Sequence, residues 1–226
     1  MPIFQLTSDL VFPNPELSEE DGLLAIGGDL SPERLLLAYS NGIFPWFNEG
    51  DPILWWSLNP RLLLFPGEFK CSNSLSRTIK SNQFEIKFDS RFAEVIQQCS
   101  KVIRNDQEGS WITQEMIAAY CRLHELGYAH SVETYFQGNL VGGLYGIAIG
   151  KAFVGESMFH TMRDASKYAL YHLQVYLKIQ RFHFMDAQQP TAHLISLGAR
   201  EIERKHYLQI LKKAIQDKTE TGKWKL

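Results

Sequence analysis

The sequence has no long apolar run and no start typical of a secreted protein. None of its apolar stretches reaches the roughly 18 residues that a membrane-spanning helix needs. The first residues, MPIFQLTSDLVFPNP, contain no basic segment followed by an apolar one, so no signal peptide is predicted. We therefore expect a cytoplasmic protein without a membrane partner.

Patterns typical of metal, disulfide and dinucleotide sites are also missing. The three cysteines are far apart and form no CxxC pair, which argues against a disulfide framework. The seven histidines include no HExxH or HxxxH pair, so no metal site is expected. The glycines of GGLYGIAIG do not form a GxGxxG motif between a strand and a helix. Gly142, Gly143 and Gly146 instead predict that another backbone or a ligand approaches closely.

Charge is unevenly distributed, although the formal net charge is only −2. Residues 1–60 contain nine acidic residues and one basic residue, Arg34, whereas residues 61–104 contain eight basic and four acidic residues. A basic stretch of this kind is compatible with an anionic partner. It is also compatible with an ordinary solvated surface, which charge alone would favour.

A change in composition predicts a domain boundary near residue 62. Residues 1–62 are rich in proline, glycine and aromatic residues, and we expect them to form a small N-terminal α/β domain. Ser31 is a typical N-cap for a helix that begins at Pro32 and ends near Gly42. The rest of this segment is expected to be loops around a small aromatic cluster. Residues 63–226 are the expected catalytic domain, and the 45% hydrophobic content supports a real core.

The larger segment predicts helices on a mixed sheet. Helices are expected at 91–103 and, capped by Thr113, at 114–126. Three strand-like runs at 130–136, 140–149 and 151–159 are separated by short turns, which indicates an antiparallel meander. An amphipathic helix at 164–180, a strand at 182–187 and helices at 191–198 and 206–216 follow, and the polar tail is expected to be loose. This is an α+β architecture whose order matches the acyl-CoA N-acyltransferase (GNAT-like) fold.

Polar residues at strand ends are the candidates for catalysis. Asp186 and Gln188 follow FHFM and are two residues apart, so in an extended segment both would face the same way. A carboxylate beside an amide can position an amine and polarise a carbonyl. Glu156 follows AFVG at another strand end. The alternatives stay open at this point, because Asp186 could cap the helix near Pro190 or bind backbone amides, and Glu156 could bond to a neighbouring strand or loop.

Four tryptophans lie outside the predicted core helices. Aromatic rings near a basic stretch can stack on nucleobases, and each stacked base stabilises binding by roughly 1–3 kcal/mol. Core packing is the favoured interpretation of Trp55 and Trp56. For Trp46 and Trp111, core packing and base stacking are equally supported.

Several blocks of the sequence, taken in order, resemble the leucyl/phenylalanyl-tRNA–protein transferases: GLLAIGGDLSPERLLLAYSNGIFPWF, WWSLNPR, WITQEMIAAYCRLHELGYAHSVE, GGLYGIAIGKAFVGESMF, ASKYAL and DAQQPTAHLISLGAREI. The resemblance extends over about residues 3 to 210. It implies transfer of Leu, Phe or Met from tRNA to the N-terminal Arg or Lys of a protein, which marks that protein for N-end-rule degradation in bacteria. It also implies an acyltransferase fold, no metal and no nucleotide cofactor. We expect a monomer.

The same resemblance implies roles for individual residues. Asp186 and Gln188 match an Asp-x-Gln motif proposed to assist attack by the acceptor's α-amine, and Glu156 matches a residue of the same centre. Either carboxylate would also attract the acceptor's basic side chain. Ala187 stands where other members have Cys, which argues against a covalent intermediate at this position. Arg77 and Lys80 are the expected tRNA phosphate contacts. The expected aminoacyl- and adenosine-binding residues are Trp46, Trp111, Tyr120, Leu144, Phe153, Ser157, Leu170 and Leu173.

Two other functions deserve comparison with the transferase. A coenzyme A-dependent N-acetyltransferase of the same fold would need a Q/R-x-x-G-x-G/A loop before a helix, and the sequence has none. An RNA-binding module would use Arg77, Lys80 and the tryptophans, but it would leave Asp186 and Gln188 without a task. The sequence therefore favours the aminoacyl transferase.

Overall fold

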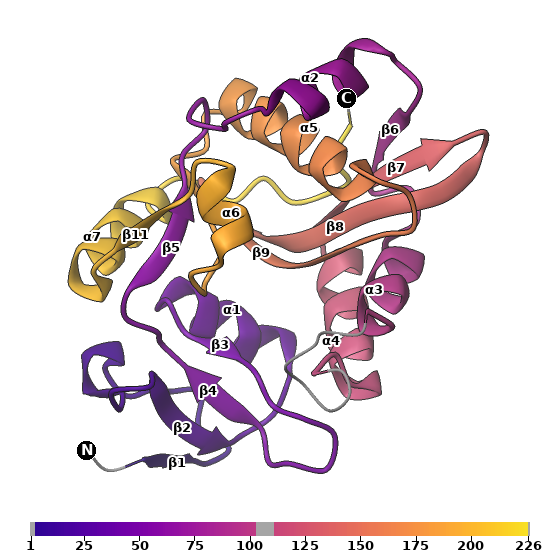
Figure 1. The fold of residues 1–226 in the computed structure, drawn as a ribbon. Coiled ribbons are helices and arrows are strands. Elements are labelled where there is room, and N and C mark those ends of the chain that lie inside the picture. Colours follow the sequence, from indigo (N-terminus) through magenta and orange to yellow (C-terminus); the bar gives the residue numbers. More distant parts are fainter. Residues whose placement is uncertain (1–2, 103–110, 226) are drawn as a thin grey trace.

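The computed structural model describes residues 3–102 and 111–225, which contain two sheets covered by helices (Figure 1). The smaller sheet has the strand order β1-β2-β4-β3. Its strands are β1 (Phe4–Leu6), β2 (Leu23–Gly27), β3 (Phe44–Pro45) and β4 (Leu54–Trp56), and a short 3-10 helix, η1, spans Pro15–Leu17. The expectation of loops in this part of the chain is therefore wrong. The strands are too short and too interrupted by proline and glycine to give a clear alternating pattern.

The expected N-terminal helix is confirmed as α1 (Pro32–Ser40). The side chain of Ser31 accepts a hydrogen bond from the backbone N–H of Arg34, and Pro32 occupies the first turn. Asn41 is the C-cap residue, and Gly42 follows with a φ of +72°.

The larger sheet has seven strands in the order β11-β5-β10-β9-β8-β7-β6. Strand β10 pairs parallel to β9, whereas the other strand pairs described in this sheet are antiparallel. The strands are β5 (Arg61–Leu64), β6 (Glu85–Phe88), β7 (Ala129–Phe136), β8 (Asn139–Ile149), β9 (Ala152–His160), β10 (Phe184–Asp186) and β11 (Arg200–Ile202). The predicted meander, β7-β8-β9, and the mixed sheet of an α+β fold are confirmed.

Helices cover both faces of this sheet (Figure 1). Leu144 and Ala148 of β8 share a core with α5, whereas Tyr145 and Ile147 share a core with α1, α3 and α4. This alternation is what a strand buried on both faces requires. The helices are α2 (Asn73–Lys80), α3 (Phe92–Ser100), α4 (Gln114–Glu125), α5 (Ala165–Ile179), α6 (Ala192–Ser196) and α7 (Arg204–Ala214). None of the described helices has the length and apolarity that a membrane crossing needs.

Several elements were not expected from the sequence, namely α2 and the strands β5, β6 and β11. Strand β5 begins at Arg61, beside the predicted boundary at residue 62, and it belongs to the larger sheet. The division into residues 1–62 and 63–226 stays a prediction. The last two residues of the predicted basic stretch, 103 and 104, lie outside the described residues.

The glycines of β8 allow close approaches of other backbone segments, as expected. A Cβ atom added to Gly146 would overlap the carbonyl oxygen of Val154 on the neighbouring strand, and one added to Gly142 would lie 2.6 Å from Cβ of Ala165. The contacting groups are protein backbone and side chain, so these glycines serve packing between β8, β9 and α5.

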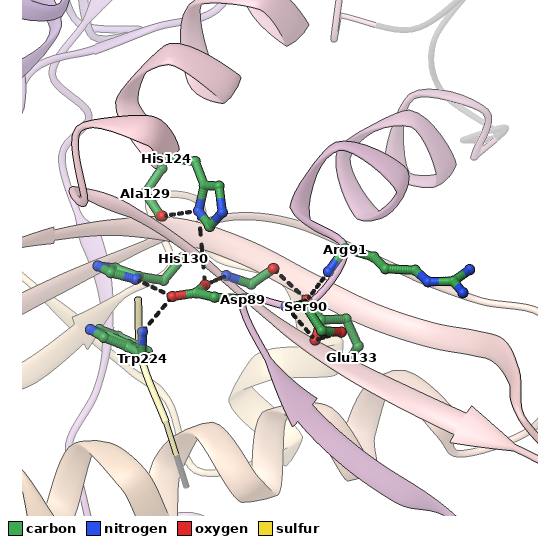
Figure 2. A network of polar contacts seen from close by, with 9 residues as sticks. Asp89, Ser90, Arg91, His124, Ala129, His130, Glu133 and Trp224 are labelled. Carbon is green, nitrogen blue, oxygen red and sulfur yellow. Dashed lines mark hydrogen bonds and ion pairs between the residues drawn. The ribbon is translucent and has the colours of Figure 1, made fainter. Parts of the chain in front are cut away.

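The C-terminal tail is not loose, because Trp224 packs into the protein. Its ring stacks on His130 at a centroid distance of 4.0 Å, and it is only 7% exposed. Its backbone N–H donates to Oδ2 of Asp89, which lies 2.8 Å from Nδ1 of His130, and Figure 2 shows the three residues together. The sequence interpretation gave weight to the polar residues of the tail and missed the single aromatic residue that anchors it.

We predict that Trp224→Ala lowers the free energy of unfolding by about 3 kcal/mol, because a buried aromatic ring is replaced by a cavity. Urea denaturation measures this change. Lys223→Ala is the matched control, since its side chain is exposed in the same tail. Equal stability of the two variants would mean that the tail does not contribute to the core.

Candidate active site

A cavity of about 290 Å³ lies between the two sheets. Its wall combines β3, the middle of β8 and of β9, and the segment from β10 to α6; β3, β8, β9 and α6 are labelled in Figure 1. The lining residues are Phe44, Pro45, Trp46, Trp111, Leu144, Tyr145, Gly155, Glu156, Ser157, Met158, Met185, Ala187, Gln188, Gln189, Thr191, His193 and Leu194. This largely apolar wall with a few polar groups is typical of a small-molecule site.

An irregularity in β9 brings consecutive residues into the cavity wall. Tyr145 of β8 pairs with Ser157 and the next residue, Gly146, pairs with Gly155, so Glu156 is the extra residue of a β-bulge. In a regular strand, neighbouring side chains point to opposite faces. The bulge breaks this alternation, and Gly155, Glu156 and Ser157 all line the cavity.

The carboxylate of Glu156 is held by three hydrogen-bond donors. Oε1 accepts from the Tyr39 hydroxyl at 2.8 Å and from Nε2 of Gln188 at 2.9 Å, and Oε2 accepts from the Tyr120 hydroxyl at 3.3 Å. The two tyrosine hydroxyls are also hydrogen-bonded to each other. These donors orient the carboxylate from three different parts of the fold at the wall of the cavity.

Burial raises the pKa of Glu156 to about 7. The hydrogen bonds from Tyr39, Tyr120 and Gln188 lower the pKa and partly offset burial, and the nearby charge of Asp186 raises it further. Glu156 therefore changes its protonation state near neutral pH. A carboxyl group in this range can accept a proton from an amine and release it again.

Asp186 does not line the cavity. It is fully buried, and its carboxylate is bound by Arg61, with Nε 3.0 Å from each oxygen and Nη2 2.8 Å from Oδ2. Tyr207 donates to Oδ2 and the backbone N–H of Gln188 donates to Oδ1, each at 2.8 Å. The guanidinium of Arg61 is itself enclosed by the rings of Phe44 and Tyr207. Because its charge is matched by Arg61, Asp186 is not available to attract a basic acceptor side chain, and that expectation is corrected.

The segment around Gln188 is a tight turn and not an extended strand. Gln188 has a φ of +61°, so the expectation that it faces the same way as Asp186 is wrong. Its main chain is fixed by Asp186 and by Leu62, whose N–H donates to the carbonyl of Gln188. Its side chain reaches Glu156 instead. Asp186 therefore holds the turn that places Gln188.

The structure brings six of the expected residues to the cavity wall: Trp46, Trp111, Leu144, Glu156, Ser157 and Gln188. Tyr120 lies behind Glu156. Phe153 of β9 and Leu170 and Leu173 of α5 are fully buried in one core cluster and are not among the residues that line the cavity, so their binding role stays a prediction. Phe153 packs with residues of α5 on one face of the sheet. Met158, Met185 and Leu194 supply apolar wall in their place.

Arg77 and Lys80 are exposed on α2. Other basic residues of the stretch 61–104 form ion pairs within the protein. Arg61 is buried against Asp186, Lys87 pairs with Glu85 and Arg91 pairs with Glu94. The basic surface that this stretch offers is therefore narrower than its composition suggests. The phosphate-binding role of Arg77 and Lys80 stays a prediction.

Sequence reasoning missed three residues that shape the site: Tyr39, Arg61 and Tyr207. Tyr39 lies on an amphipathic helix, where an aromatic residue indicates core packing. Its hydroxyl contact to Glu156 joins residues far apart in the chain. Arg61 carried a signal, because an arginine directly before the apolar run LLLF begins a buried strand and needs a partner.

Comparisons with known proteins identify relatives along the whole chain. The family description "Leucyl/phenylalanyl-tRNA protein transferase" matches residues 63–212, and its N-terminal domain matches residues 28–59. The "Leucyl/phenylalanyl-tRNA--protein transferase" of Syntrophobacter fumaroxidans is 54% identical over 224 residues, which cover 99% of this chain and 96% of the relative. The protein of the same name from Nitrosomonas eutropha is 55% identical over 221 residues, covering 97% and 94%.

Solved structures with a similar arrangement are much more distant. L-PGS from Bacillus licheniformis is 12% identical, with a TM-score of 0.40, over 76% of this chain and 54% of that one. The aminoglycoside acetyltransferase meta-AAC0020 from a soil metagenomic sample is 11% identical, with a TM-score of 0.37, over 50% and 84%.

Proposed function

Because the chain belongs to the leucyl/phenylalanyl-tRNA protein transferase family, we propose that it transfers leucine or phenylalanine from an aminoacyl-tRNA to the α-amine of a protein. The acceptor in this proposal begins with Arg or Lys, methionine is a third donor, and the product is marked for degradation. The observation that carries the proposal is the oriented carboxylate of Glu156 at the wall of a cavity with Trp46 and Trp111.

The chemistry of this transfer fits the groups in the cavity. An aminoacyl ester is already activated, so the amine nitrogen can form a C–N bond to the ester carbonyl as the C–O bond to the tRNA ribose breaks. The α-amine has a pKa near 7.7–8.0, so a modest base suffices to take its proton. Glu156 accepts that proton and passes it to the ribose oxygen, which leaves as a hydroxyl group. The apolar wall excludes water, which would otherwise hydrolyse the ester.

The protein's remaining contribution is alignment. Gln188, Tyr39 and Tyr120 hold Glu156, and the buried pair of Asp186 and Arg61 holds the turn that carries Gln188. Bringing the amine and the ester into contact supplies a large part of such a rate enhancement. A negatively charged Glu156 also favours an acceptor whose first side chain is basic.

Leu144 is proposed to limit the aminoacyl pocket, together with Met158 and Met185. We predict that Leu144→Trp lowers phenylalanine transfer at least about tenfold and leucine transfer less, because the added ring fills the space of the larger donor. Met should be a weaker wild-type donor than Leu, since apolar pockets discriminate by about 1–3 kcal/mol per methylene. Side chains branched at Cβ, such as Ile and Val, should be poor donors because their χ1 is restricted.

Competition between tRNAs of identical sequence charged with Leu, Phe, Met, Ile or Val measures these preferences. Leu126→Trp is the matched control, because Leu126 is 38% exposed at the end of α4. Selection by the pocket is refuted if Ile transfers as well as Leu, or if Leu144→Trp leaves the ratio of Phe to Leu transfer unchanged.

Transfer RNA binding is predicted to depend on salt through Arg77 and Lys80. Cations that contact phosphates release counterions, so affinity should fall steeply as salt rises. The Arg77→Ala/Lys80→Ala variant should lower the affinity and reduce the slope of log K against log salt by about 1–2. Filter binding across a salt series measures both. An unchanged slope would place the phosphate contacts on another surface.

A single assay tests the proposed function. The protein is mixed with Leu-tRNA and a peptide that begins with Arg, without coenzyme A, and the expected product is the peptide extended by one leucine. A coenzyme A-dependent acetyltransferase would give no product under these conditions, and an RNA-binding module would bind the tRNA without transfer. Absence of the extended peptide, with intact Leu-tRNA recovered, would overturn the proposal.

A further inference from the structure

A second cavity adjoins the proposed active site. Its volume is about 610 Å³, and it shares Met158 and His193 with the first cavity. The rest of its wall comes from Val102, the end of β9 and the start of α5: Phe159, His160, Thr161, Arg163, Asp164, Ser166 and Lys167. The two cavities therefore meet at the C-terminal end of β9 and the side of α6, beyond the bulge that carries Glu156.

The polar groups of this second cavity favour an anion. Arg163 and Lys167 are cationic, with side chains 85% and 37% exposed, so their charges are accessible from the mouth. Among the described residues of this wall, the one carboxylate is that of Asp164, which lies 3.3 Å from Nζ of Lys167 and 3.8 Å from Nε of Arg163. Burial lowers the pKa of His193, and the positive charge of Lys167 and the neighbouring His160 lower it further. The described part of the wall thus carries two cations and one carboxylate and is net positive.

The second cavity is also joined to the surface predicted to bind tRNA. Arg163 donates to the side chain of Ser74, at 3.4 Å, and Thr78 donates to Asp164, at 3.3 Å. Ser74 and Thr78 lie on α2, the helix that carries Arg77 and Lys80. A chain of phosphates that runs from α2 to the first cavity would therefore meet the cations of the second cavity on its way.

We propose that this second cavity binds the nucleotide that precedes the terminal adenosine of the aminoacyl-tRNA, with its phosphodiester at Arg163 and Lys167. This proposal rests on the proposed function. An RNA phosphate fits better than the acceptor peptide, because an acceptor that begins with Arg or Lys would be repelled by the two cations. His193, which lines both cavities, marks the passage between the nucleotide and the adenosine.

Two minimal donors test the assignment: phenylalanyl-adenosine, and the same compound with one cytidine joined through a 3′–5′ phosphodiester. In the wild type, kcat/KM should be about tenfold higher for the dinucleotide donor, the effect of one charge-assisted contact. The Arg163→Ala/Lys167→Ala variant should lose this gain and use phenylalanyl-adenosine within about twofold of the wild type. The control variant Lys212→Ala/Lys213→Ala removes two exposed cations from α7 and should keep the gain.

The outcomes separate this site from the proposed function. The site is refuted if the wild type gains nothing from the added nucleotide, or if the double variant keeps the full gain. It is also refuted if the double variant changes only KM for the acceptor peptide, because the cavity would then bind the acceptor. If wild-type protein transfers from neither minimal donor nor from intact Phe-tRNA, the proposed function itself fails, and the site with it.

Discussion

Replacement of Glu156 by Gln is expected to lower the rate constant of aminoacyl transfer by roughly 10²–10⁴-fold, the usual contribution of a positioned general base. The amide cannot accept the proton of the attacking amine. It also presents an NH₂ group to a site where Tyr39, Tyr120 and Gln188 all donate. The fold should survive, because the shape of the side chain is kept.

The pKa of Glu156 determines in which direction the transfer rate changes with pH. The folded protein holds the pKa of Glu156 near 7, above the usual value of a carboxyl group, so the ionised and active form is populated only as pH rises through about 7. The rate should therefore fall below pH 7 in the wild type. In the pH–rate profile of Glu156→Gln, the decrease caused by protonation of Glu156 should vanish. The decrease caused by protonation of the acceptor amine, whose pKa is about 7.7–8.0, should remain. Single-turnover transfer rates between pH 5.5 and 9 measure both limbs.

Two controls accompany the pH series. Binding of aminoacyl-tRNA should stay within about twofold of the wild type, since phosphate contacts dominate the affinity. Glu156→Asp keeps the charge and should retain a limb below neutral pH, with a lower rate because the shorter side chain moves away from its donors. A Glu156→Gln variant with wild-type rate and pH profile would remove Glu156 from the chemistry.

Asp186→Ala is expected to abolish most transfer and to destabilise the protein by about 3–5 kcal/mol, because it leaves Arg61 charged and unpaired in the core. Binding of tRNA should stay near the wild-type value as long as the variant is folded. The loss of transfer follows from the turn at Gln188, whose backbone N–H donates to Asp186. Activity and stability would fall together in this variant, so a second one is needed to separate them.

The double variant Arg61→Met/Asp186→Leu makes that separation. Replacement of a whole buried ion pair by apolar residues is often neutral for stability. The free energy of unfolding should therefore return close to the wild-type value, measured in urea, while transfer stays low because Gln188 has lost its anchor. Recovery of both stability and transfer would show that Asp186 has no part in positioning Gln188.

The parts of the fold that the sequence predicted have local signals. The helix after Thr113 has a capping residue, an amphipathic pattern and a terminal glycine, and the cap bond is present. The meander β7-β8-β9 has apolar runs separated by short turns. The missed strands, such as β5 and β11, contain only three or four residues and pair with strands distant in the chain. Their pairing partners cannot be inferred from local patterns.

In the site, too, local sequence signals were predictive and contacts between distant residues were not. Asp186, Gln188 and Glu156 could be selected from their positions at strand ends. Their actual geometry depends on a bulge in β9 and on a positive φ at Gln188, neither of which has a marker in the sequence. The partners of the two carboxylates come from other elements, with Tyr39 separated from Glu156 by 117 positions and Arg61 from Asp186 by 125. Such pairs become visible only in the folded protein.

The central claim is that the donor's aminoacyl-adenosine end occupies the cavity beside Glu156. A crystal structure with phenylalanyl-adenosine made non-hydrolysable by an amide link in place of the ester tests it most directly. The account predicts the adenine against Trp46 or Trp111, the phenyl ring against Leu144 and Met158, and the carbonyl carbon facing Gln188 and Glu156. The claim is contradicted if the compound binds outside this cavity, or if it binds with its carbonyl turned away from Glu156.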